Sequence, residues 1–204
     1  MDLLVCRSRA VLPLLVLALT WGAAPSAAQE LVFEAEAAQT HVEFTLGASF
    51  HTVHGSFRLK GGEIHFDPTT GAAGGELVVD ATSGDTGNSS RDKRMHREIL
   101  ESQRYPEIKF TVQQVRGTVP TEGSSQVQLE GIMTLHGGQH EMTITAAVQV
   151  NQGSVTADAH FVVPYVQWGL KNPSSFFLRV SDRVDITVHA VGRVTAAAVT
   201  ASQK

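Results

Sequence analysis

The sequence is poor in cysteine, in aromatic residues and in long apolar runs. Its one cysteine, Cys6, stands before residue 28, so a chain cleaved there would have no disulfide and no thiolate nucleophile. Asp and Glu (20) outnumber Lys and Arg (16), which gives a formal charge of −4. A nucleic-acid partner would require a basic face, so this mild acidity argues against one.

The first 28 residues follow the pattern of a signal peptide. Arg7 and Arg9 precede an apolar run at 10–19, and Ser26-Ala27-Ala28 is a small-x-small cleavage pattern. This apolar run is shorter than the roughly 20 residues that span a bilayer, so we expect no permanent membrane anchor. We expect an exported protein, either periplasmic or secreted, with one domain over 29–194 and a flexible tail at 195–204.

Apolar residues alternate with polar ones in segment after segment of this domain, which is typical of antiparallel strands with one face inward. Turn residues are expected between strands at Gly61-Gly62, Asp67-Pro68, Gly137-Gly138 and 151–153. Successive strands with short turns predict an all-β meander that closes into one antiparallel barrel of about eight strands. A sandwich of two sheets gives nearly the same pattern and stays an alternative.

One stretch, 88–110, departs from the alternation and predicts a helical insert near residues 90–102. Ser89 followed by Asp92 matches a capping box. The expected i,i+4 ion pairs are Arg94 with Glu98 and Arg97 with Glu101. A single charged helix in a closed barrel must lie across an end or a side, and we expect its apolar residues Met95, Ile99 and Leu100 to seat it there.

A second unusual stretch, 163–177, combines Pro164 and Pro173 with the chain's densest group of aromatic residues. These aromatic side chains would either plug an end of the core or line the entrance for an apolar ligand.

Residues for metal binding or catalysis are scattered. Nine histidines form no compact group with carboxylates; His136 and His140, for example, should point to different faces of a hairpin. There is no G-x-S-x-G nucleophile motif. We therefore predict no metal site, no catalytic residue and no enzyme, although a small barrel isomerase or hydratase stays a less favoured alternative.

Several short motifs, in this order and spacing, are similar to those of one family of exported bacterial proteins. They are Thr40–Phe44, Gly55-Ser56-Phe57, Arg91-Asp92, Tyr105–Phe110, Gly131–Gly137 and Val180–Val184. Together they resemble the YceI-like, or polyisoprenoid-binding, family. The resemblance implies a lipocalin-like barrel whose apolar lumen holds a long isoprenoid such as a quinone or polyprenyl lipid. Pro164 departs from the family pattern, because many members have an arginine there.

The sequence and the resemblance together predict a binding protein that transports or stores an apolar lipid, with no cofactor other than that ligand. Its predicted lumen residues are Phe44, Leu46, Phe57, Phe110, Phe161 and Trp168. Arg91 and Asp92 are predicted at the polar rim. Transient membrane contact and a homodimer are both compatible with this function. The alternative is a filled barrel with a structural or stress-related role and no bound lipid.

Overall fold

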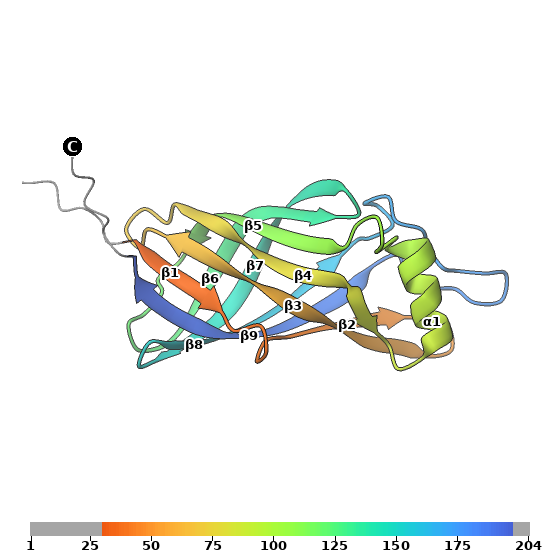
Figure 1. The fold of residues 1–204 in the computed structure, drawn as a ribbon, viewed down its shortest axis with the longest axis horizontal. Helices are drawn as coiled ribbons and strands as arrows, with labels where there is room; N and C mark the ends of the chain where they lie inside the picture. The colour runs from red at the N-terminus through yellow and green to blue at the C-terminus, as the bar shows by residue number, and fades with distance from the viewer. Residues whose placement is uncertain (1–29, 198–204) are drawn as a thin grey trace, which may run out of the picture.

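The computed structural model describes residues 30–197, and Figure 1 shows them as an elongated β-barrel with α1 at one end. The predicted signal peptide, residues 1–28, lies outside the described residues. So do residues 198–204 of the predicted tail. Within residues 30–197, no helix has the length and apolar character needed to cross a membrane.

Nine strands and one short helical segment make up the part of the chain that the structure describes. The strands are β1 (Leu31–Ala35), β2 (His41–Gly47), β3 (Thr52–Phe66), β4 (Ala73–Asp85), β5 (Glu107–Arg116), β6 (Gly123–Leu135), β7 (Gly138–Asn151), β8 (Ser154–Val163) and β9 (Val184–Ala196). The helical segment between β4 and β5 consists of α1 (Ser89–Arg94) and a π-helical turn, η1 (Met95–Ile99).

The sheet closes on itself with eight strand positions. β1 and β2 share one position, because each pairs with β3 on one side and with β9 on the other. β3 also pairs with β4, and the remaining strands follow in chain order with every neighbour antiparallel. This arrangement confirms the predicted barrel of about eight strands. It excludes the sandwich alternative, which would leave sheet edges open.

Alternate residues of the strands face the lumen, as the period of two predicted. In β7, Ile144, Ala146, Val148 and Val150 are buried, whereas the residues between them are exposed. Small side chains meet on neighbouring inward faces, since Ala146 lies opposite Ala159 in β8. Such pairs leave space in the lumen that larger side chains would fill.

Two of the predicted turns are confirmed. At 67–71 the Asp67 carboxylate accepts a hydrogen bond from the Thr69 N–H at 2.7 Å. Between β7 and β8, Gln152 and Gly153 have φ values of 50° and 78°, the positive values of a two-residue hairpin turn.

The prediction of a turn at Gly61-Gly62 was wrong, because both residues lie inside β3 next to a register shift against β4. Gly62 has a φ of +143°, and a Cβ there would stand 2.1 Å from the backbone oxygen of Glu76. The pair of glycines therefore lets two strands approach closely rather than reverse the chain.

The turn between β6 and β7 consists of His136 and Gly137, not Gly137 and Gly138 as predicted, and Leu135 pairs with Gly138. The two registers differ by two residues, so they turn the same side chains inward. The alternation of apolar residues could not distinguish them.

The helical insert is confirmed, but its cap differs from the prediction. Asn88, not Ser89, is the N-cap, and its side chain accepts a hydrogen bond from the Arg91 N–H at 3.1 Å. The Asp92 carboxylate instead accepts from the N–H and the hydroxyl of Thr86, at 3.0 and 2.5 Å. Thr86 precedes the helix, so this pair of hydrogen bonds ties the end of β4 to the first helical turn.

Only one of the two predicted ion pairs on the helix forms. Arg94 lies 3.2 Å from Glu98, as expected, whereas Arg97 also pairs with Glu98, at 2.5 Å. Glu101 has a φ of 46°, so the helix has ended before it, and its carboxylate lies 3.9 Å from Arg104 instead.

Apolar residues of the insert seat it on the barrel as predicted. Ile99 and Leu100 pack against a core cluster that includes Leu135 and Val163. The Met95 side chain lies close to Gly84, where a Cβ would stand 2.7 Å from its terminal methyl group. In Figure 1 the helix lies at the end of the barrel opposite β1.

The barrel extends beyond the predicted boundary at residue 194. β9 continues to Ala196, which pairs with Leu31 of β1, and the Ala197 N–H donates to the Glu30 oxygen at 2.8 Å. Residues 195–197 therefore belong to the barrel rather than to a flexible tail, because β1 uses them as hydrogen-bond partners.

Replacing Met95 and Ile99 together with Asp should lower the free energy of unfolding by about 2 kcal/mol or more, because two half-buried apolar contacts become charged. Urea denaturation would measure the change. Lys93→Asp changes the net charge by the same amount at an exposed position of the helix and should have little effect. Equal stability of the double variant and the wild type would contradict this seating of the helix.

Gly62→Ala should destabilise the barrel more than Gly61→Ala, by about 1–3 kcal/mol. Both glycines have φ values near +140°, but a Cβ at Gly61 meets no atom within 4 Å. The difference between their thermal or urea unfolding curves isolates the contact with Glu76. If the two variants lost the same stability, backbone conformation alone would account for both.

Candidate functional site

Two adjoining cavities lie in the lumen that residues 30–197 enclose. The larger, of about 460 Å³, lies under the helical insert, and we call it the helix-end cavity. The smaller, of about 160 Å³, lies toward β1 and is called the far cavity. Met133, Phe161 and Val188 belong to the walls of both. The two cavities are therefore neighbours along one lumen, and we call the three apolar side chains that line both of them the neck.

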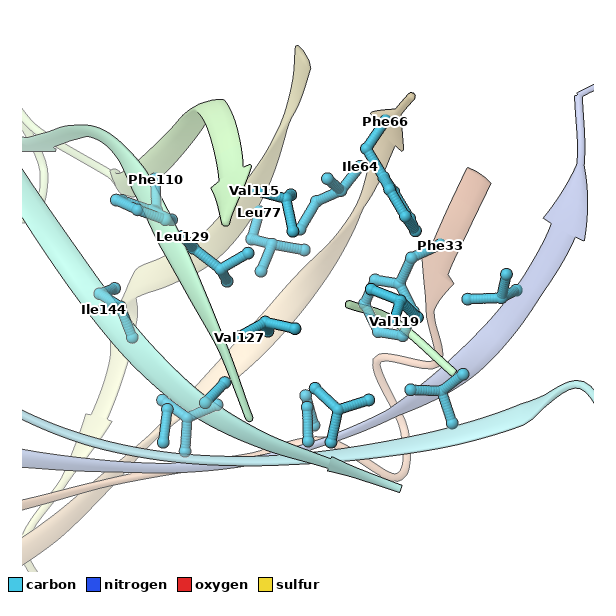
Figure 2. Close-up of a pocket in the computed structure, with 18 of the residues that line it drawn as sticks. Phe33, Ile64, Phe66, Leu77, Phe110, Val115, Val119, Val127, Leu129 and Ile144 are labelled. Carbon is cyan, nitrogen blue, oxygen red and sulfur yellow. The ribbon is translucent and has the colours of Figure 1, made fainter. Parts of the chain in front are cut away.

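The far cavity is apolar throughout. Figure 2 shows the side chains around it, and the drawn sticks are carbon alone. Phe33 of β1 and Phe66 of β3 are among its larger side chains, whereas Ala157 and Ala159 of β8 are among its smallest. A group with a hydrogen-bond donor or acceptor would find no side-chain partner in this wall, so the far cavity suits a hydrocarbon.

The helix-end cavity is apolar in its depth and polar at the insert. Strands β2 to β6, β8 and β9 supply aliphatic and aromatic residues to its wall, as does the helical insert. Its polar side chains are those of His51, Thr86, Ser90, Arg91, Arg94 and Tyr165. His51, Ser90 and Arg94 are exposed as well, so solvent reaches the cavity at this end.

Most of the predicted lumen residues line the cavities. Phe44, Leu46 and Phe57 belong to the helix-end cavity, where the rings of Phe44 and Phe57 lie 5.3 Å apart at 36°. Phe110 lines the far cavity, and Phe161 belongs to the neck. Direct contact of these residues with a ligand stays a prediction.

Arg91 also lines the helix-end cavity, but its guanidinium is partly committed to the protein. Its Nε donates to the Thr86 hydroxyl at 2.7 Å, and one terminal nitrogen donates to the Thr86 carbonyl at 2.8 Å. Asp92 is outside the wall of this cavity, and its carboxylate accepts a hydrogen bond from the same Thr86 hydroxyl. The Arg91-Asp92 pair thus positions the helix at the rim, and Arg91 alone faces the cavity.

Trp168 lies outside both cavities, contrary to the prediction that it lines the lumen. Its ring stacks on the ring of His140, with the centroids 4.1 Å apart and the planes at 1°. The residue packs against both core clusters. Trp168 therefore plugs the core beside the lumen, which was one of the two roles open to the aromatic stretch 163–177.

Tyr165, one of the aromatic residues of the stretch 163–177, lines the helix-end cavity, although it was not among the predicted lumen residues. Its hydroxyl donates to the Ser181 carbonyl at 2.6 Å, and burial raises the pKa of Tyr165 to about 12. The phenol is therefore protonated at neutral pH, and its hydrogen bond holds the β8–β9 connection against the cavity wall. The sequence did indicate that Tyr165 points inward, because it follows Val163 by two residues and so continues the inward phase of that strand.

The ionised groups near the rim are largely paired. Hydrogen bonds from Arg97 and Arg94 lower the pKa of Glu98. In residues 30–197, no three His, Cys, Asp or Glu side chains come together as a metal-binding group. The arrangement offers an apolar chamber with arginine and hydroxyl groups at its open end.

Known proteins share this fold. A structure of BcnA from Burkholderia cenocepacia is 18% identical and has a TM-score of 0.65, over 77% of this chain and 98% of that one. A polyisoprenoid binding domain from Saccharophagus degradans, described as implicated in plant cell wall breakdown, is 15% identical with a TM-score of 0.61, over 80% and 98%. At these identities the likeness shows the fold alone.

Sequence comparison agrees with the structural one. A UPF0312 protein of Vibrio cholerae is 28% identical over 124 residues, which are 58% of this chain and 62% of that protein. The chain thus matches less than two thirds of that relative's length. The family model of the YceI-like domain matches residues 33–192, which is most of the described barrel. The chain belongs to the YceI-like family.

Proposed function

We propose that this protein is an exported, non-enzymatic binding protein that carries or stores a long isoprenoid lipid, such as a quinone or a polyprenyl chain, in the barrel lumen. The observation that carries the proposal is the pair of adjoining apolar cavities with one polar, solvent-reaching end. A relative of the same fold described as a polyisoprenoid binding domain supports it. The signal-peptide pattern at residues 1–28 supports export to the periplasm or beyond.

Burial of the hydrocarbon is the proposed source of affinity. Each CH₂ group removed from water contributes about 0.8 kcal/mol, so one five-carbon isoprene unit contributes a few kcal/mol. Association costs about 4–15 kcal/mol in lost freedom of motion, so several units must be buried before binding is favourable. This requirement favours a long chain that occupies both cavities over a small apolar molecule in one.

The lumen also suggests how the ligand is oriented. The hydrocarbon end would pass the neck of Met133, Phe161 and Val188 into the far cavity, where every wall residue is apolar. The polar group would stay near Ser90 and Arg94. Within the described residues, the walls of the two cavities contain no Asp or Glu, which supports holding a ligand rather than acid–base chemistry.

Mature protein purified from its own host should carry lipid. Native mass spectrometry should show a mass above that of the polypeptide, and organic extraction should release an isoprenoid. Lipid-free protein should also bind added ubiquinone or polyprenol. Absence of lipid together with no binding of either compound would contradict the proposal and favour a filled structural barrel.

Ala157→Phe should weaken the binding of a long polyprenol about tenfold or more, because the new ring occupies the far cavity. A short isoprenoid alcohol that fits in the helix-end cavity should bind with little change. Ala147→Phe adds the same ring on the exposed face of β7 and serves as the matched control. Equal losses for the long and the short alcohol would argue against a chain that extends into the far cavity.

A further inference from the structure

Three phenylalanine side chains are almost fully exposed. Phe50, Phe176 and Phe177 have relative exposures of 82%, 94% and 82%. Among the described residues the one other large hydrophobic side chain classed as exposed is Val162, at 44%. Aromatic rings with this much exposure indicate a surface that binds an apolar partner.

The three rings lie on two loops that hydrogen bonds hold together. We call these loops, residues 48–51 and 171–183, the mouth loops. The Ser49 N–H donates to the Arg179 oxygen at 2.9 Å, and the Ser181 N–H donates to the Gly47 oxygen at 2.8 Å. Figure 1 shows the longer loop projecting beyond the barrel at the end where α1 lies.

Local contacts also shape the tip of the longer loop. The Ser175 N–H donates to the Leu178 oxygen at 2.8 Å, and this hydrogen bond encloses the two adjacent phenylalanines. The rings of Phe176 and Phe177 meet edge to face, with centroids 5.0 Å apart. The rings of Phe176 and Phe177 are thus held in place by the backbone and by each other.

The mouth loops also line the helix-end cavity. Ala48 and His51 of the shorter loop belong to its wall, as do Pro173, Leu178 and Val180 of the longer one. The exposed rings therefore stand beside the opening of the lumen. An apolar molecule entering or leaving at this end would pass next to them.

Charge at this end has the opposite sign to that of the chain as a whole. Residues 171–183 contain Lys171, Arg179 and Arg183 against one carboxylate, Asp182. Basic residues also outnumber acidic ones in 85–99, whereas the whole chain has a formal charge of −4. Lys171 and Arg179 are both exposed, and within residues 30–197 neither forms an ion pair with a carboxylate.

We propose that the mouth loops dock the barrel on an anionic lipid bilayer, with Phe50, Phe176 and Phe177 inserted at the interface and Lys171 and Arg179 at the head groups. Exposed aromatic rings flanked by basic side chains are the combination that binds membrane interfaces. The purpose of docking rests on the proposed function. A bilayer placed against the mouth lets a lipid pass into the lumen without crossing water.

A second copy of the chain is the weaker candidate for the occupant of this surface. A stable protein interface uses about 20–30 residues on each side. Three projecting rings and two cations are few for such an interface. They suffice for reversible attachment to a bilayer, where each ring enters the apolar phase independently.

The test is flotation of the lipid-free mature protein with vesicles made of equal parts phosphatidylcholine and phosphatidylglycerol. The wild type should float with these vesicles, and less of it should float as salt is added. The triple variant Phe50→Ser, Phe176→Ser, Phe177→Ser should lower the partition coefficient about tenfold or more. The double variant Lys171→Gln, Arg179→Gln should lower binding to the anionic vesicles but not to pure phosphatidylcholine.

Val162→Ser is the matched control, because it removes the remaining exposed hydrophobic side chain on the wall of the barrel. It should leave flotation unchanged, and thermal unfolding should show that every variant is folded. Equal flotation of the triple variant and the wild type would overturn the proposal. So would a wild-type dimer that the triple variant converts to a monomer without any change in flotation.

Lipid binding in detergent solution separates this proposal from the proposed function. The triple variant should bind polyprenol in detergent as well as the wild type does, because its substitutions are outside the cavity walls. A wild type that floats but binds no polyprenol would refute the carrier function and leave docking in place. A wild type that binds polyprenol but does not float would refute docking alone.

Discussion

Closure of the sheet is the constraint on which the rest of the structure depends. Because β3 pairs with β4 while β1 and β2 share one position, the described sheet has eight antiparallel positions around one interior. A closed sheet satisfies its backbone hydrogen bonds between strands and divides the side chains into an inward and an outward set. The lumen is apolar because the inward side chains of this chain are apolar, and its free volume depends on their size.

The two ends of the barrel differ because the long connections gather at one of them. The helical insert and the mouth loops meet around the helix-end cavity, where hydroxyl, guanidinium and imidazole groups reach solvent. At the far end, β1 pairs with the last residues of β9. In the proposed function this polarity would set one direction for ligand entry and one for the hydrocarbon end, and the proposed docking surface lies beside the entry.

Much of the candidate site could be predicted because inward position follows from alternation. Phe44, Leu46, Phe57, Phe110 and Phe161 all line a cavity, as an inward phase along their strands requires. Asp92 and Trp168 do not, and strand alternation could not place either one, because Asp92 lies in α1 and Trp168 in the β8–β9 connection. Each instead bonds or stacks with a residue that spacing could not identify, Thr86 for Asp92 and His140 for Trp168.

By itself, the sequence determined the all-β class, the inward residues of the strands, the helical insert and the family. Local periodicity and short motifs carry that information along the chain. Only the tertiary structure decided the register of the β6–β7 hairpin, the continuation of β3 through Gly61 and Gly62, and the convergence of the exposed phenylalanines at the mouth. Each of these depends on which strands and loops become neighbours, and alternation is the same for every register that keeps the apolar face inside.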